Sequence, residues 1–393
     1  MKQQLLFTIS LFFIVSSVCS QAPDLSPKSY ISVITCGSGE DLYTSFGHSA
    51  FRVQDSVLGI DVVYNYGTFD FNAPNFYTKF AGGQLLYTLS RSRFENFLYS
   101  YELEKRWVKE QILNLTLEEK NNLFNYLENN YLPENRGYNY DFFFDNCSTK
   151  KIDILTEVYG DKVVFRDDHL EEQYSFRELI RQKVKTNTWG GFGIDLALGS
   201  VIDEKATSIE HTYLPDYLMR QLNHTDFKGK PLVQRERTIL DFEEKNGTPY
   251  FLGSPLFWIL LFLLFVVSIT YIDHKNKVRS RGLDFFLFFT TGVIGLVIIF
   301  LWFFTDHSAT AGNFNILWGF APNLAIAFLT ARKNRLPNWF DKYLWVLGTL
   351  LLLTIILWLL GTQLFSPLII PILLALGIRY LFLHHTFKKG ELV

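Results

Sequence analysis

A cysteine at the start of an expected helix is the first residue of this chain whose type and place suggest chemistry. Cys147 lies in the stretch DNCSTKK, directly before the segment IDILTEVYG. Asp145 or Asn146 suits the N-cap position, and apolar residues recur at spacings of three and four from Ile152 to Tyr159, which predicts a helix. Cys147 is then expected in the first turn, where unpaired N–H groups and the helix dipole lower the pKa of a thiol and can donate to an oxyanion.

A thiolate nucleophile needs a general base, and histidine is the usual one. The first 250 residues contain four histidines, and His48 differs from the other three in its setting. It directly follows SFG and opens HSAFRV, which alternates as a strand does. The glycine at that point lets backbone or substrate come close. The remaining histidines are interpreted as solvated or packing residues: His169, His211 and His224.

From the residues alone, three interpretations of this pair stay open. Cys147 and His48 can form a nucleophile–base dyad. His48 can instead be a hydrogen-bonded strand histidine, with Cys147 a small buried residue at a helix start. Cys147 can also form a disulfide with Cys36, since the compartment expected for this part of the chain is oxidising.

The elements that must position these residues form a mixed α+β pattern. Alternating or β-branched runs predict strands, and 3.6-residue periodicity predicts helices. Thr116 and Glu119 form a capping-box pattern that opens one helix. The expected strands are 29–36, 48–53, 60–67, 84–90 and 107–115, and the expected helices are 94–104, 117–130 and the one that follows Cys147.

The C-terminal part of the chain reads as a membrane domain. Five apolar runs approach the length of about 20 residues that a bilayer core requires: 254–272, 283–304, 314–331, 343–361 and 366–383. The linkers at 273–282 and 332–342 and the C-terminal tail carry Lys and Arg, whereas the alternate linkers carry none. The positive-inside rule therefore predicts a cytoplasmic C-terminus.

The N-terminal end predicts export. Residues 1–20 read as a signal peptide, with Lys2 before an apolar core and small residues before the cleavage point. The expected organisation is a signal peptide (1–20), an extracytoplasmic domain (21–250, the outer domain) and a five-span membrane domain (251–393), in the inner membrane with the outer domain in the periplasm.

Several classes of partner and cofactor are not expected. The formal net charge is −2, with no Arg/Lys stripe for nucleic acid. The chain has no CxxC or HxxxH spacing for a metal and no P-loop or Rossmann fingerprint. Asp306 and His307, at the outer end of the second span, are either solvated or make a polar contact to a lipid head group or to the outer domain.

The sequence segments that contain these residues resemble those of a known family. ITCGSGEDLYTSFGHSAFRV, VYNYGTFDF, YNYDFFFDNCSTKKIDIL and YLPDYL resemble the periplasmic domain of the Lnb-type lipoprotein N-acyltransferases. TDHSATAGNFNILW is similar to that family's loop between spans. The order His before Cys also resembles the lecithin–retinol acyltransferase branch of the papain-like superfamily, which implies a permuted papain-like α+β fold.

This resemblance implies roles for particular residues. Cys147 is then the nucleophile and His48 its base. We look for the third, orienting residue at Asn65 or Tyr66 on the next strand, and Asn146 is expected to support the turn as its capping residue. The resemblance also implies a thioester intermediate, with a membrane phospholipid as acyl donor and a diacylated lipoprotein as acceptor. A Cys36–Cys147 disulfide would inactivate such a nucleophile.

Two rival interpretations share these residues. A membrane-anchored papain-like hydrolase, a peptidase or cell-wall amidase, would use the same Cys147 and His48 but pass the acyl group to water. A receptor or assembly factor of the outer leaflet would keep Cys147 only for structure. Five spans argue against the hydrolase, because a single anchor would suffice, and the intact GHSAF and DNCST words argue against the receptor.

Overall fold

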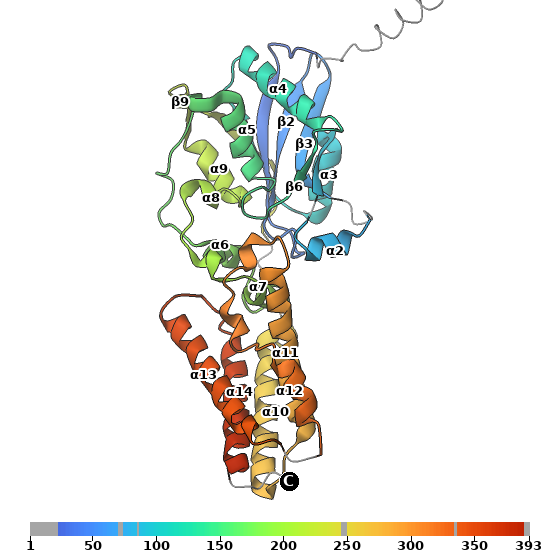
Figure 1. Cartoon of the computed structure of the whole chain (residues 1–393). Helices are drawn as coiled ribbons and strands as arrows, with labels where there is room; N and C mark the ends of the chain where they lie inside the picture. Colours follow the sequence, from blue (N-terminus) through green and yellow to red (C-terminus); the bar gives the residue numbers. More distant parts are fainter. Residues whose placement is uncertain (1–22, 70–73, 85, 245–249, 334–335, 389–393) are drawn as a thin grey trace, which may run out of the picture.

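The computed structural model describes residues 23–69, 74–84, 86–244, 250–333 and 336–388. In Figure 1 the outer domain stands on one end of a bundle of long helices. The predicted signal peptide, residues 1–20, lies outside the described residues. Within them, the expected mixed fold followed by a helical membrane part is confirmed.

A seven-stranded antiparallel sheet forms the centre of the outer domain, in the order β10-β5-β1-β2-β3-β4-β6. All five predicted strands are present. Two further strands complete the edges of the sheet, and β10 comes from the chain just before the membrane part. The bounds are β1 Tyr30–Cys36, β2 His48–Asp55, β3 Ile60–Thr68, β4 Leu86–Arg93, β5 Val108–Leu113, β6 Gly137–Asn139 and β10 Val233–Leu240.

Helices cover both faces of this sheet. On one face, α4 (Leu117–Tyr131), α5 (Thr149–Tyr159) and α9 (Pro215–Asn223) pack against alternate strand residues to form the main core. On the other face, α3 (Phe94–Glu104) packs through two phenylalanines. The predicted capping box of α4 is present. Leu123 of α4 is fully buried, and such a side chain contributes about 1.5–3 kcal/mol through removal from water.

Shorter elements connect the sheet to the bundle. A second sheet contains β7 (Val163–Phe165), β8 (Thr225–Phe227) and β9 (Lys230–Pro231). Helices α2, α6 and α7 lie at the end of the outer domain nearest the bundle (Figure 1). The remaining bounds are α2 Phe76–Ala81, α6 Phe176–Lys183, α7 Trp189–Ala197, α8 Ser208–His211, η1 Gly160–Lys162, η2 Ser200–Asp203 and η3 Phe251–Gly253.

Among the described residues, four helices are long and apolar enough to cross a membrane, one fewer than the five predicted. They are α10 Pro255–Asn276, α11 Arg281–Phe303, α13 Trp339–Leu359 and α14 Ile369–Lys388. The third expected span, 314–331, is instead broken into η5 (Phe314–Ile316) and the eight-residue α12 (Asn323–Thr330). The segment expected as the third span is therefore not one continuous helix in the part of the chain that the structure describes.

The broken segment lies alongside α11 in direct backbone contact. A β-carbon added to Gly295 would lie 2.0 Å from the carbonyl oxygen of Gly319, and one added to Gly292 would lie 2.2 Å from the nitrogen of Leu324. Pro322 immediately precedes α12 and has no N–H to continue a helix from the residues before it. The close approach to α11 thus takes the place of a regular helix over 317–322.

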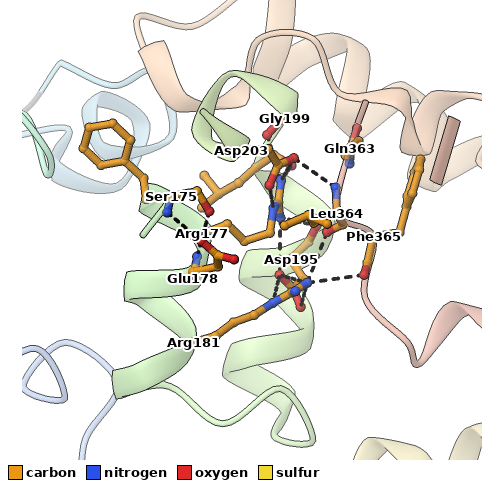
Figure 2. Close-up of polar contacts among 12 residues, drawn as sticks. Ser175, Arg177, Glu178, Arg181, Asp195, Gly199, Asp203, Gln363, Leu364 and Phe365 are labelled. Carbon is orange, nitrogen blue, oxygen red and sulfur yellow. Dashed lines mark hydrogen bonds and ion pairs between the residues drawn. The ribbon is translucent and has the colours of Figure 1, made fainter. Parts of the chain in front are cut away.

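A polar network joins the outer domain to the bundle (Figure 2). Arg177 and Arg181 of α6 both pair with Asp195 of α7, at 3.3 and 3.1 Å. Arg181 also donates to the carbonyl oxygens of Leu364 and Phe365, in the turn between α13 and α14. The N–H of Leu364 donates to Asp203. Because these bonds connect residues more than 160 positions apart, they hold the two parts together as one unit.

Candidate active site

The turn that carries Cys147 is held by its neighbour Asn146. Helix α5 begins at Thr149 with Ser148 as N-cap residue, so Cys147 lies just before the helix rather than in its first turn as predicted. The side chain of Asn146 nevertheless caps this turn, because its Oδ1 accepts from the N–H groups of Ser148 (2.7 Å) and Thr149 (3.0 Å). Its Nδ2 donates to the carbonyl oxygens of Phe142 and Tyr213. Asn146 therefore positions the turn without contacting the sulfur.

This capping corrects the expectation about oxyanion donors. The N–H groups of Ser148 and Thr149 already donate to Asn146, so they are not free to bind a developing oxyanion. In the part of the chain that the structure describes, the backbone N–H of Cys147 has no acceptor. It is therefore one donor beside the sulfur that remains available.

His48 opens strand β2 and reaches Asn65 on strand β3. Backbone pairing sets His48 opposite Cys36, and Gly47 before it has φ +81. A β-carbon on Gly47 would lie 2.9 Å from the carbonyl oxygen of Cys36, so a larger residue would disturb this strand end. Nε2 of His48 lies 2.5 Å from Oδ1 of Asn65. The structure thus brings together two of the residues predicted from sequence.

Gly67 lies where Cys147 and His48 meet. The ring of His48 is flanked by Phe97 of α3, on one face of the sheet, whereas Cys147 precedes α5, which covers the other face. A β-carbon on Gly67 would lie 3.5 Å from Cβ of Cys147 and 4.0 Å from Cε1 of His48. Gly67 also has φ +91 at an irregularity in the β3–β4 pairing. A glycine at this point leaves open the space that the two side chains share.

The surroundings of Cys147 favour a thiolate. Burial by itself raises the pKa of the Cys147 thiol, but the charge of His48, its hydrogen bond and the charge of Lys151 outweigh burial and lower this pKa to about 6. Cys147 as a residue is only partly buried. A partly buried cysteine of lowered pKa beside a histidine is the arrangement of an activated nucleophile.

The second cysteine within the described residues, Cys36, has the opposite surroundings. Cys36 is fully buried, and burial raises its pKa to about 12. Both cysteines are free, so the Cys36–Cys147 disulfide considered from sequence is not formed. Cys36, at the end of β1 and beside the first residue of β2, is therefore a packing residue.

Tyr66 does not take the orienting position. Adjacent strand residues point to opposite faces, and Tyr66 points into the main core, where its ring packs edge-on against Tyr138. Its buried hydroxyl has no hydrogen-bond partner among the described residues. Of the two predicted orienting residues, Asn65 contacts His48 and Tyr66 does not.

Asp306 and His307 contact the outer domain, one of the two polar contacts considered from sequence. Gln84 donates to the Asp306 carboxylate at 2.9 Å, and the N–H of Asp306 donates to the carbonyl oxygen of Gly82. Nε2 of His307 lies 3.0 Å from the carbonyl oxygen of Phe80 in α2. These bonds tie the outer end of α11 to the segment after α2.

The same loop also contacts the segment that leads to Cys147. Ser308, in η4 (Ser308–Thr310), donates to Asp141 at 3.1 Å. Ala309 packs against the aromatic cluster that includes Phe143. The loop that carries Cys147 therefore rests on the outer end of the membrane bundle.

Sequence reasoning missed two residues at this site. Gly67 could have been noticed in the motif NYG at the end of an expected strand, because a glycine at such a point often adopts positive φ. Lys151 is fully buried directly below Cys147, and no local pattern indicates a buried lysine.

Two family models match the chain. The Lnb N-terminal periplasmic domain matches residues 22–182, and the Lnb transmembrane domain matches residues 245–390. No curated protein and no solved structure matches it. The two matches leave between them only the segment that contains α7 to β10, and they agree with the mixed outer domain and the apolar helices described above. The chain belongs to the Lnb-type lipoprotein N-acyltransferase family, as a multi-pass membrane protein with a periplasmic domain.

Proposed function

We propose that this protein moves an acyl chain from a membrane phospholipid, through a thioester on Cys147, to the α-amine of the lipid-modified N-terminal cysteine of a lipoprotein. The observation that carries the proposal is that Cys147, on a loop that rests on the membrane bundle, meets His48 of β2 and its partner Asn65 of β3. A thiol of lowered pKa beside a histidine suits acyl transfer, because a thioester reacts readily with amines.

In the first half-reaction, His48 holds the proton of the Cys147 thiol, and the thiolate attacks an ester carbonyl carbon of the phospholipid. The C–S bond forms and the carbonyl oxygen becomes an oxyanion, which the N–H of Cys147 stabilises. The ester C–O bond then breaks, and His48 returns its proton to the leaving lysophospholipid oxygen. The acyl group stays on the sulfur.

In the second half-reaction, the free amine of the lipoprotein attacks the thioester carbonyl, and His48 accepts the amine proton. The C–N bond forms, the C–S bond breaks, and Cys147 leaves as a thiolate. The products are an N-acylated lipoprotein and the starting form of the enzyme. In the first half-reaction the thiol proton passes through His48 to the lysophospholipid oxygen, and in the second the amine proton stays on His48.

The membrane arrangement proposed here has five crossings, of which the third is the broken segment 313–330. Asn313 donates to the carbonyl oxygen of Leu196 beside the outer domain, whereas Thr330 accepts from Arg279 in the basic linker after α10. These two bonds at opposite ends support a crossing antiparallel to α11. Five crossings set the basic linkers and C-terminus in the cytoplasm, the outer domain in the periplasm and the bundle in the inner membrane.

The fold proposed for the outer domain (21–250) is the permuted papain-like one. Support comes from the order of the two residues, with His48 on a strand upstream of Cys147, and from α5 packing on an antiparallel sheet. Helix α2 lies at the end of the outer domain nearest the bundle (Figure 1). Its exposed Tyr77 and Phe80 are proposed to contact the membrane surface.

The test is expression in a host that lacks its own lipoprotein N-acyltransferase, followed by the mass of a lipoprotein N-terminal peptide. Wild type and Cys36→Ala are expected to add one acyl chain, and Cys147→Ser to add none. Wild type should also carry an acyl adduct on Cys147. An unchanged lipoprotein mass with the protein expressed would contradict transfer, and release of free fatty acid in its place would indicate the hydrolase. An adduct on Cys36 would overturn the assignment of the nucleophile.

A further inference from the structure

Lys151 bridges the main chain of the two candidate catalytic segments. Its Nζ donates to the carbonyl oxygen of Cys147 at 2.6 Å and to that of Ser49, the residue after His48, at 3.0 Å. The side chain is fully buried. One lysine on α5 therefore ties the turn that carries the sulfur to the strand that carries the histidine.

The charge of this lysine lacks a carboxylate partner among the described residues. Its ammonium lies over the rings of Phe51 (5.5 Å) and Tyr66 (5.2 Å). A buried ammonium is strongly destabilising unless an opposite charge compensates it. The titratable side chains that interact with Lys151 or with the Cys147 thiol come from β1, β2, β3, α3, β6 and the segment after β6: Cys36, His48, Tyr66, Tyr101, Tyr138 and Tyr140.

None of these six side chains carries a stable negative charge near neutral pH. Burial raises the pKa of Cys36 to about 12 and raises the pKa of each tyrosine above its ordinary value. The thiolate of Cys147 is the remaining anion.

We infer that Lys151 is a positioning residue for the nucleophile: it holds the main chain of Cys147 against the strand that bears His48, and its buried ammonium is the counter-charge of the Cys147 thiolate. This inference rests on the proposed role of Cys147 as nucleophile. The acyl chemistry itself does not touch Lys151, which acts through the position and charge state of the sulfur.

The ionisation of the two groups agrees with such a pair. Burial lowers the pKa of Lys151 to about 8, and the nearby Cys147 opposes this effect. The pKa of Cys147 is lowered to about 6, with Lys151 among the causes after burial and His48. Thiolate and ammonium therefore coexist between about pH 6 and pH 8.

The experiment measures the rate of Cys147 alkylation by iodoacetamide against pH in the purified full-length protein, with the labelled peptide identified by mass. In Lys151→Met the midpoint is expected to move to higher pH, and the rate at pH 6 to fall about fivefold or more, because the thiolate fraction falls. Lys151→Arg keeps the charge and should retain a midpoint near that of wild type.

Lys120→Met is the matched control. Lys120 is also buried and also donates to a backbone carbonyl, that of Ser29 at 2.7 Å. Its loss should leave the midpoint unchanged, although it removes the same kind of bond. An unchanged midpoint in folded Lys151→Met, or an equal change in Lys120→Met, would overturn the inference.

A second pair of variants tests the inference without His48. His48→Ala removes the larger charge effect, so burial should raise the midpoint above that of wild type, and adding Lys151→Gln, which keeps a donor but not the charge, should raise it further. Equal midpoints in His48→Ala and His48→Ala/Lys151→Gln would contradict a role for Lys151, even if Lys151→Met did not fold. Alkylation needs no lipid or lipoprotein, so failure of this inference is distinct from failure of the proposed acyl transfer.

Discussion

The side-chain oxygen of Asn65 lies 2.5 Å from Nε2 of His48. An amide oxygen can only accept a hydrogen bond, so Nε2 must carry the hydrogen, which leaves Nδ1 unprotonated in the neutral ring. That nitrogen can then accept the thiol proton of Cys147. Through a single contact, Asn65 sets both the orientation of the ring and which nitrogen acts as base.

Replacing this acceptor should therefore slow catalysis without removing a reacting group. In Asn65→Ala the ring of His48 is free to rotate, and the rate of Cys147 acylation is expected to fall about a hundredfold, since misplacement by about 1 Å has that cost. The measurement is single-turnover acylation of Cys147 followed by intact mass.

Asn65→Asp is the matched control, because its carboxylate still accepts from Nε2. This variant should retain most of the rate that Asn65→Ala loses. If Asn65→Ala acylates Cys147 as fast as wild type, or if both variants lose the same rate, Asn65 does not orient His48.

The lowered pKa of Cys147 predicts the pH dependence of acylation. The reactive thiolate is present above the lowered pKa of about 6 and is lost as pH falls below it. Single-turnover acylation should therefore be half-maximal near pH 6 on its acidic side. A half-maximal value near the ordinary thiol value of about 8.5 would contradict the environment described for Cys147.

Gly67 is expected to matter for the reaction beyond its backbone conformation. Gly67→Ala places a methyl group against both Cys147 and His48 at φ +91. It should slow acylation at least about tenfold, because misplaced reacting groups lose rate steeply. It should also lose about 1–2 kcal/mol of unfolding free energy from the left-handed backbone.

Gly59→Ala separates these two effects. Gly59 has φ +68, but nothing lies within 4 Å of an added β-carbon. Thermal unfolding of the two variants should show a similar loss, while only Gly67→Ala slows acylation. Equal acylation rates would mean that Gly67 serves the turn and not the site.

The junction between the two parts gives a prediction about transfer to lipoproteins. Arg181→Met removes the bonds to Leu364 and Phe365, and a hydrogen bond to a charged group is worth about 1.5–3 kcal/mol. The outer domain, and with it Cys147, is then held less firmly in its position relative to the membrane helices. Lipoprotein acylation should fall, whereas alkylation of Cys147 by iodoacetamide should keep its rate.

Lys205→Met is the control for this prediction. Lys205 makes a surface pair with Glu178, a type of pair worth about 0–1 kcal/mol, and its loss should leave both readouts unchanged. Acylation in Arg181→Met at the wild-type level would show that the junction does not limit transfer.

Local patterns in the sequence predicted most elements of the outer domain. The five strands, helices α3 and α4, and the capping box of Thr116 and Glu119 were all confirmed. Alternation, helical periodicity and capping depend on residues only a few positions apart, so the sequence records them locally. The start of α5 was placed too early, since the side chain of Asn146 extends the turn before it. The third expected span is not one continuous helix, because its backbone packs directly against α11.

By itself, the sequence determined the candidate pair, His48 and Cys147, the family and the division into outer and membrane parts, since each is recorded in contiguous words or runs of residues. Only the tertiary structure decided between Asn65 and Tyr66, because neighbours on a strand point to opposite faces and the sequence does not say which face meets His48. The same holds for Lys151 and Arg181, whose partners lie on other elements. Burial and contact across distant segments are properties of the assembled chain, so these roles became visible only in the fold.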